Sequence, residues 1–246
     1  MNLHVINSNS QGNAYILQNE DEALLIECGV NFKEIKKGLN FNISKVVGCL
    51  VTHEHKDHCK AVGKVLSAGI DVYATRGTHE AMATLYHHRS KIVGVHTTRQ
   101  IGRFKVYFFD VEHDCADPVG FYIDHPDTGK FIFLTDTFYC KHKFAALNNV
   151  IIEANHCKEI IRRKLEEGKT KKFLRDRVIE SHMSLQTCVS TLLANDLSQV
   201  NNILLIHLSD SHSDADKFKT TVRSATGKPV HIADPGLIIN FNKNPF

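Results

Sequence analysis

Residues 53–58 read His-Glu-His-Lys-Asp-His, and the interpretation of the whole chain starts from this stretch. His53 and His55 are two residues apart, so both rings can face one cation if the chain is extended there. Asp57 and His58 come next, at the start of a helical pattern, and can turn toward a second cation. Imidazole and carboxylate are the ligands expected for Zn²⁺, with Mn²⁺ or Fe²⁺ as alternatives. The stretch therefore predicts a site for two divalent metal ions rather than an ordinary polar loop.

Five short apolar runs predict buried β-strands, because they are rich in aliphatic, aromatic and β-branched residues. The runs span residues 46–51, 106–111, 131–134, 150–152 and 203–206. Each run is followed within two residues by a histidine or a carboxylate, namely His53, His113, Asp136, Glu153 and His207. Chemistry in layered α/β folds usually lies beyond the carboxyl ends of strands, so these side chains are expected to gather at one edge.

The residues at the later strand ends complete the predicted two-metal site. A carboxylate such as Asp136 can serve both cations, and His113 and His207 would each complete one of the two sites. The open positions would hold a bridging water, which the metal ions acidify into a hydroxide nucleophile. Asp57 would have a second, catalytic role, since it can also take a proton from that water. A purely structural metal site in a nucleic-acid-binding protein is disfavoured, because structural zinc sites are normally closed by four protein ligands.

Helical patterns lie between some of the predicted strands. An apolar face at residues 61–66, with Gly69 as its stop, predicts one helix, and residues 185–193 predict another. Ser213 with Asp216 resembles a capping box that opens a third helix. Strands mixed with helices indicate an α/β or α+β chain in which helices cover the sheets.

The composition is that of a globular protein. Of the 246 residues, 42% are hydrophobic and 23% are charged, and the formal net charge is only +3. No repeat or linker divides the chain, so residues 1–246 are expected to form a single domain. The N-terminus does not resemble a signal peptide, and no apolar run is long enough to predict a membrane span. The seven cysteines, an odd number without a CxxC pair, favour a reducing cytoplasm.

The pattern HxHxDH after a strand, with His, Asp and His at later strand ends, resembles the metallo-β-lactamase superfamily over nearly the whole chain. Further segments are similar to its YycJ/WalJ-like branch, namely Asn9 to Tyr15, His113-Asp114, Pro118 to Phe121, Thr135-Asp136-Thr137, Glu153-Ala154-Asn155-His156, Ser181-His182-Met183-Ser184 and His207-Leu208-Ser209. Glu27-Cys28-Gly29 stands where the family usually has Asp-Ala-Gly or Asp-Cys-Gly. The resemblance implies a four-layer αββα sandwich with the metal ions at one edge. Members of this branch are regarded as DNA exonuclease-like or phosphodiesterase-like enzymes.

The resemblance also implies a catalytic pair. In ribonuclease Z-like relatives, a strand-end glutamate orients and charges a histidine from a later loop. That histidine stabilises the phosphate or protonates the leaving group. Glu153 and His182 match this pattern in order and context. The alternative is that His182 merely begins a helix and bonds to the backbone.

A basic segment precedes His182. Residues 158–177 contain nine Lys or Arg and four acidic residues, a net charge of +5 that exceeds the +3 of the whole chain. Beside a metal site, such a segment suits a polyanionic substrate. The residues expected to bind substrate are Arg162, Arg163, Lys164 and Arg177. A solvated helix face is the alternative interpretation, since many charge runs are only that.

These features predict a two-metal hydrolase of ester bonds, and in particular a phosphodiesterase or nuclease that acts on nucleic acid or a nucleotide. A DNA exonuclease-like activity is the first hypothesis, and a cyclic-nucleotide phosphodiesterase is a narrower variant. The main alternative is a hydrolase of small thioesters or lactones, which would need the same metal ions but neither Glu153, His182 nor the basic segment. The sequence leaves open DNA or RNA, exo- or endonucleolytic cleavage, and the oligomeric state, a dimer included.

Overall fold

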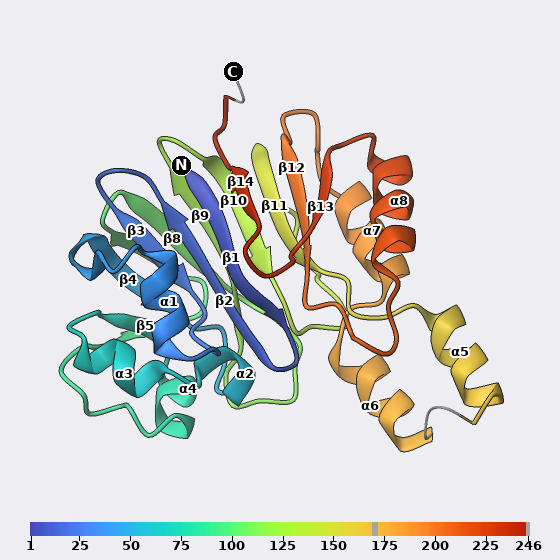
Figure 1. Cartoon of the computed structure of the whole chain (residues 1–246), viewed down its shortest axis with the longest axis horizontal. Helices are drawn as coiled ribbons and strands as arrows, with labels where there is room; N and C mark the ends of the chain where they lie inside the picture. Colours follow the sequence, from blue (N-terminus) through green and yellow to red (C-terminus); the bar gives the residue numbers. More distant parts are fainter. Residues whose placement is uncertain (169–171, 245–246) are drawn as a thin grey trace.

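Two seven-stranded sheets pack face to face in the computed structural model (Figure 1), which describes residues 1–168 and 172–244. The first sheet has the order β14-β1-β2-β3-β4-β5-β6. Its strands are β1 (Asn2–Asn9), β2 (Gly12–Gln18), β3 (Ala23–Ile26), β4 (Val46–Leu50), β5 (Val72–Thr75), β6 (Ser90–Val93) and β14 (Ile238–Asn240). The second sheet has the order β13-β12-β11-β10-β9-β8-β7. Its strands are β7 (Thr98–Ile101), β8 (Phe104–Asp110), β9 (Val119–His125), β10 (Gly129–Leu134), β11 (Leu147–Glu153), β12 (Asn202–Ile206) and β13 (Val230–Ile232).

Helices form the two outer layers. Between strands of the first sheet lie α1 (Phe32–Gly38), a 3₁₀ turn (Ile43–Lys45), α2 (Lys56–Cys59), α3 (Val62–Ser67) and α4 (Arg76–Ala81). Between strands of the second sheet lie α5 (Lys158–Glu166), α6 (Lys172–Ser181), α7 (Leu185–Leu193) and α8 (Ala215–Thr226). Apolar side chains of α1 and α3 pack on the first sheet, and those of α7 and α8 pack on the second. The αββα sandwich implied by the family resemblance is therefore confirmed.

The strand β10 shows why the predicted strands read as continuous apolar runs. Phe131 and Phe133 join the core between the two sheets, whereas Ile132 and Leu134 join the core under α7 and α8. Successive side chains of a strand point to opposite faces, so a strand buried on both faces has no polar positions. All five predicted strands are present, as β4, β8, β10, β11 and β12.

The predicted helices are present as well, with one correction. Residues 62–67 and 185–193 form α3 and α7, and Gly69 follows α3 with a φ of 86°. The third helix begins one residue later than the predicted capping box. Its N-cap is Asp214, whose carboxylate accepts a hydrogen bond from the backbone N–H of Lys217 at 3.0 Å, while the Ser213 hydroxyl donates to the carbonyl of Ser209. The Ser213 hydroxyl is therefore engaged by the backbone before the helix, and Asp214 caps the helix instead.

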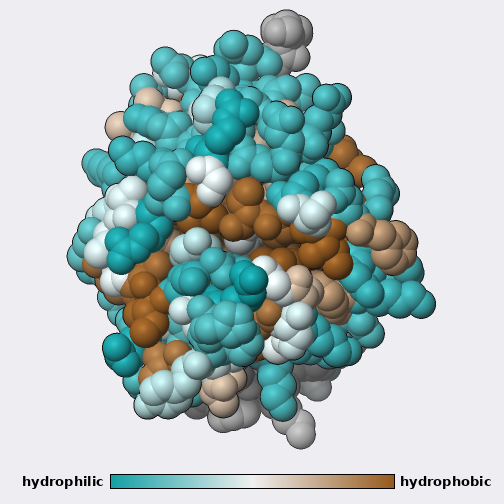
Figure 2. Space-filling model, turned by 90° about the vertical axis from the view of Figure 1, so that its left-hand side faces the viewer, coloured by the Kyte–Doolittle hydropathy of each residue, from teal (hydrophilic) through white to brown (hydrophobic). Residues whose placement is uncertain are grey.

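The edge strands β6 and β7 lie on one side of the sandwich. Figure 2 views the molecule from this side and shows a hydrophobic band between hydrophilic regions. Val47, Tyr73 and Val95 are partly buried and pack against the core between the sheets. None of the helices in the described part of the chain is long and apolar enough to cross a membrane. All seven cysteines are free thiols.

Candidate metal centre and active site

The residues predicted as metal ligands come together at one edge of the sandwich. Loops beyond the carboxyl ends of β4, β8, β10 and β12 carry five of them, and α2 carries the other two. The seven residues are His53, His55, Asp57, His58, His113, Asp136 and His207, and all belong to groups whose ligand atoms lie within 4.8 Å of one another. The shared position at strand ends therefore does bring these side chains together.

Three imidazoles and one carboxylate form the first ligand group, which consists of His53, His55, His113 and Asp136. His55 Nδ1 lies 3.2 Å from His113 Nε2, and His53 Nε2 lies 3.3 Å from Asp136 Oδ2. Ligands bound at about 2.0–2.1 Å to a tetrahedral zinc ion are about 3.3 Å apart along each edge of the tetrahedron. The spacing of the first group matches the ligand shell of one divalent cation.

The second ligand group consists of Asp57, His58 and His207. Asp57 Oδ2 lies 3.4 Å from His58 Nε2 and 3.3 Å from His207 Nε2. Asp136 connects the two groups, because the same Oδ2 atom that faces His53 lies 2.9 Å from His58 Nε2. One carboxylate oxygen thus lies between two sets of imidazole nitrogens.

An unpaired nitrogen supports the interpretation of this cluster as a metal centre. His53 is only 1% exposed, yet its Nε2 has no hydrogen-bond partner among the described residues. A buried polar atom left without a partner costs about 1–3 kcal/mol. A cation between His53 and Asp136 would satisfy both atoms. The donor types, their spacing and this unpaired nitrogen all fit divalent metal ions.

The backbone around the cluster is tightly constrained. Asp136 and His207 have φ values of 47° and 54°, in the left-handed region that Asp and His enter more readily than most residues. Gly29 lies so close to the metal-binding loop that a Cβ there would be 1.6 Å from the backbone oxygen of Asp57. The N–H of Cys28 donates to the carbonyl of His58 at 2.8 Å. Gly29 therefore allows the segment after β3 to hold α2 in place.

Side chains outside the ligand set support individual rings. His53 Nδ1 lies 2.9 Å from Thr52 Oγ1, and His58 Nδ1 lies 3.6 Å from Glu27 Oε1. The Nδ2 atom of Asn13 lies 3.2 Å from His58 Nε2, the same nitrogen that faces Asp57 and Asp136. A hydrogen bond such as that of Thr52 fixes the orientation of a metal-binding ring, whereas Glu27 lies beyond hydrogen-bond distance of His58 Nδ1 and acts on that ring through its charge. Sequence reasoning missed these roles, although Glu27 and Asn13 both lie in segments that resemble family motifs.

Glu153 connects His182 to the ligand cluster. Its Oε1 lies 2.8 Å from His182 Nδ1 and 3.2 Å from His207 Nδ1. Burial alone would lower the pKa of His182, but the charges and hydrogen bonds of Glu153 and Asp136 together outweigh it and raise that pKa to about 10. The structure therefore brings Glu153 and His182 together. It also shows that the same carboxylate contacts His207, which the sequence did not indicate.

A cavity of about 310 Å³ opens onto the cluster. Its lining comprises Ser10, His55, Asp57, His113, Asp114, Asp136, Val178, Ser181, His182 and His207. Residues of both ligand groups and His182 therefore face the same space. A bound molecule in this cavity would contact all three at once.

The structure does not bring Arg162, Arg163 or Lys164 into this cavity. Arg162 and Arg163 are exposed on α5, and Lys164 Nζ donates to the carbonyl of Ser211. None of the described residues of α5 lines the cavity, and α5 projects from the sandwich beside α6 (Figure 1). Arg177 belongs to α6, but its side chain lies outside the described residues.

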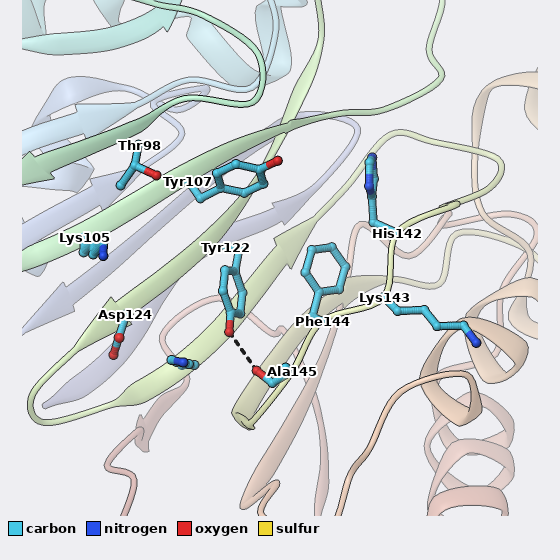
Figure 3. Close-up of a pocket in the computed structure, with 10 residues that line it drawn as sticks. Thr98, Lys105, Tyr107, Tyr122, Asp124, His142, Lys143, Phe144 and Ala145 are labelled. Atoms are coloured by element: carbon cyan, nitrogen blue, oxygen red, sulfur yellow. Dashed lines mark hydrogen bonds between the residues drawn. The ribbon is translucent and has the colours of Figure 1, made fainter.

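A larger cavity, about 480 Å³, lies on the outer face of the second sheet. Figure 3 shows Tyr107 of β8 and Tyr122 of β9 on the side of Phe144 and its neighbours in the loop before β11, whereas Lys105 of β8 lies at the other end of the cavity, near Thr98 and Asp124. The hydroxyl of Tyr122 donates to the carbonyl of Ala145 at 2.7 Å. This cavity contains no residue of the ligand groups, so size alone does not identify the reactive site.

The sandwich and its strand-end ligand cluster define a metallo-β-lactamase-type hydrolase. The family model for the β-lactamase superfamily domain matches residues 23–208, and the chain belongs to this superfamily. Exodeoxyribonuclease YycJ of Bacillus anthracis is 30% identical over 226 residues, covering 85% of this chain and 83% of that protein. Exodeoxyribonuclease WalJ of Streptococcus pneumoniae is 28% identical over 225 residues, with 85% and 82% covered. The crystal structure of YhfI from Bacillus subtilis, a metallo-β-lactamase fold protein, covers 97% of this chain and 98% of its own with a TM-score of 0.75 and 17% identity.

Family and site together make the protein a metal-dependent hydrolase of ester bonds. The family supplies the hydrolase fold, and the ligand cluster supplies a place for divalent ions at the mouth of a cavity. The class of ester that enters this cavity is a separate question, which depends on His182 and its surroundings.

Proposed function

We propose that this protein is a nuclease that hydrolyses phosphodiester bonds of DNA, in the manner of an exonuclease. The observation that carries the proposal is the contact between Glu153 and His182, 2.8 Å apart, at the wall of the cavity that holds the ligand cluster. Hydrolysis of a small acyl ester has no need of this charged pair. The names of the two relatives, both exodeoxyribonucleases, support the same substrate class.

Two divalent ions, Zn²⁺ by preference and Mn²⁺ or Fe²⁺ as alternatives, would be held by the two ligand groups with Asp136 between them. Bound ions at such a site neutralise phosphate charge and make water a stronger nucleophile. Asp57 is the carboxylate that faces the cavity from the second group. Hydrogen bonds and charge from His207 and His58 overcome the effect of burial and hold its pKa well below the usual range. An ionised Asp57 can accept a proton from the attacking water.

His182 is the proposed partner of the phosphate. Its Nδ1 is engaged by Glu153, so Nε2 is the nitrogen left to meet substrate. With a pKa raised to about 10, the ring is protonated at neutral pH. It can therefore balance charge on the phosphate or donate a proton from Nε2 to the leaving oxygen.

The basic residues of α5 would act farther from the reaction. Arg162 and Arg163 are exposed, so they suit contacts with phosphates of a long strand beyond the scissile bond. Neutralising both should weaken binding of a long strand and reduce the salt dependence, while hydrolysis of a small phosphodiester stays unchanged. Seven free thiols support the cytoplasm as the site of action.

The substitution His182→Ala tests the substrate class. It should lower kcat on a phosphodiester by at least about 100-fold, a typical loss for a general acid, while the metal content stays the same. Glu153→Gln should act in the same direction, and the double variant should be little worse than His182→Ala, because residues that act as a unit are not additive. Full activity of His182→Ala on DNA would refute the catalytic role of Glu153 and His182. Efficient turnover of a thioester or lactone, with DNA and other phosphodiesters untouched, would overturn the proposed function.

A further inference from the structure

A smaller cavity, about 200 Å³, adjoins the metal-side cavity. His182 lines both, so its imidazole forms the wall between them. The two cavities differ in charge. Asp57, Asp114 and Asp136 line the metal-side cavity, whereas none of the described residues that line the smaller one is acidic. A cation suits the first space, and an anion suits the second.

His156 lines the smaller cavity and lacks polar partners. It is 1% exposed, and neither ring nitrogen has a hydrogen-bond partner among the described residues. A neutral imidazole has one N–H donor and one acceptor, and burying both without partners is unfavourable. The backbone fixes the residue, because its carbonyl accepts the N–H of Leu185 at 2.8 Å and it forms a bridge with Ser184. A buried ring held at the cavity wall without a partner indicates that the cavity receives a polar ligand.

Two helices of nine residues begin at this cavity. Lys158 is the first residue of α5, whose N-cap Cys157 makes no side-chain capping bond. Ser184 is the N-cap of α7, and its hydroxyl lies 2.9 Å from that of Thr187. This contact uses one of the two hydroxyl protons, so the other stays available to the cavity. The N-terminus of α7 is already capped, since the Ser184 hydroxyl accepts the N–H of Thr187 at 3.1 Å, so the uncapped N-terminus of α5 and the free hydroxyl proton are the features that favour an oxyanion such as a phosphate.

An aromatic ring lies beside these donors. Phe138 follows Asp136 by two residues, lines the smaller cavity and is 46% exposed. A half-exposed phenyl ring next to a phosphate-binding space suits stacking against a nucleobase. A phosphate group fits within the volume of this cavity, and Phe138 at the rim would then lie beside the adjoining base.

We propose that the smaller cavity is a subsite for the terminal phosphate of a nucleic-acid strand, with His156, Lys158 and the remaining hydroxyl proton of the Ser184–Thr187 pair as its donors. The inference rests on the proposed function, because the scissile phosphate would lie on the other side of His182, at the metal centre. Occupation of this subsite would anchor the end of the strand and place the adjoining phosphodiester for hydrolysis. It thereby explains how this site would select strand ends.

The test compares DNA strands of one sequence that carry a 5′-phosphate, a 3′-phosphate or hydroxyl groups at both ends. The metal-loaded protein should hydrolyse one phosphorylated strand with a kcat/KM at least about tenfold above the hydroxyl-ended strand, as expected for loss of a hydrogen bond to a charged group. The preferred end assigns the polarity. Lys158→Ala should bring the ratio toward one by slowing the phosphorylated strand alone, and so should the double variant Ser184→Ala/Thr187→Val, which removes both hydroxyls.

Lys105→Ala is the matched control, because Lys105 is an exposed lysine in the outer cavity of Figure 3, remote from His156 in the fold. It should keep the wild-type preference. Equal hydrolysis of all three strands, or a preference that Lys158→Ala and the Ser184→Ala/Thr187→Val double variant leave intact, would overturn the subsite while the nuclease stands. Failure to hydrolyse any strand would overturn the proposed function and the subsite with it. His156→Gln, which keeps a polar side chain, should also reduce the ratio and guards against a folding defect in one variant.

Discussion

His58 and His207 differ from His53 in the group that supports the ring, although all three are buried and face the same ligand cluster. His58 Nδ1 lies 3.6 Å from a carboxylate oxygen of Glu27, and His207 Nδ1 lies 3.2 Å from one of Glu153. The corresponding nitrogen of His53 lies 2.9 Å from the hydroxyl of Thr52. The second ligand group thus has carboxylate support, and His53 of the first group has a neutral partner.

The difference shows in the charge states of the rings. Burial lowers the pKa of all three, and it leaves that of His53 well below its usual range. Asp136 and Glu27 overcome burial at His58 and raise its pKa well above the usual value. Asp136, Asp57 and Glu153 raise that of His207 to about 9. Equal burial is therefore accompanied by opposite pKa shifts, and the carboxylates beside His58 and His207 make the second group the more basic ligand set.

The largest effect is expected where the two groups meet. Asp136→Ala removes the carboxylate that contacts His53 and His58, so both ion positions lose a ligand together. Bound metal should fall from about two ions per chain to fewer than one, and hydrolysis should fall to the detection limit. Elemental analysis and a phosphodiester assay measure both. Retention of two ions would show that the groups are independent.

A smaller effect on metal affinity should distinguish a charged carboxylate beside a ligand ring from a neutral hydroxyl. Glu27→Gln keeps the shape of the side chain but removes its charge, and it should weaken metal affinity roughly 10- to 100-fold, as for other residues that support a ligand. Thr52→Val, its matched control at His53, should cost clearly less. Competition with a chromophoric chelator gives both affinities. Equal losses of metal affinity in the two variants would mean that the charge of the residue beside the ring does not affect metal binding.

The effect with the smallest consequence for the metal centre concerns His156, the buried ring without a partner. Burial lowers its pKa to about 4 from 6.5, so the unfolded chain takes up a proton in this interval and the folded chain does not. Stability should therefore fall as the pH drops from about 6.5 to 4, by up to about 3 kcal/mol from this residue. His156→Gln should lose less stability than the wild type between pH 7 and pH 4.5 in urea unfolding. Parallel losses in the two proteins would contradict an uncharged His156.

Much of this arrangement could be predicted from sequence because it is local. A strand buried on both faces is a continuous apolar run, and the residue that follows it must lie at the sheet edge, as Asp136 and His207 do. The stretch from His53 to His58 carries four ligands on one turn and a short helix, so its chemistry is visible without any long-range contact.

Other features depend on contacts between distant segments. The second role of Glu153, beside His207 as well as His182, arises only when β11 pairs with β12. Arg162 and Arg163 precede His182 in the sequence, but the fold places them on the exposed face of α5, outside the cavity, so their role in substrate binding stays a prediction. His156 had no signal of its own, since the lack of a partner for a buried ring is visible only once the neighbouring elements are placed.

The most direct test of the account is a single assay of metal-dependent DNA hydrolysis. Protein stripped with a chelator, and the same protein reloaded with Zn²⁺ or Mn²⁺, would be incubated with linear DNA and with a small thioester. The account predicts that stripped protein is inactive, and that about two equivalents of metal restore hydrolysis of DNA but give no comparable turnover of the thioester. DNA hydrolysis that persists without metal, or reloaded protein that consumes the thioester and leaves DNA intact, would contradict it.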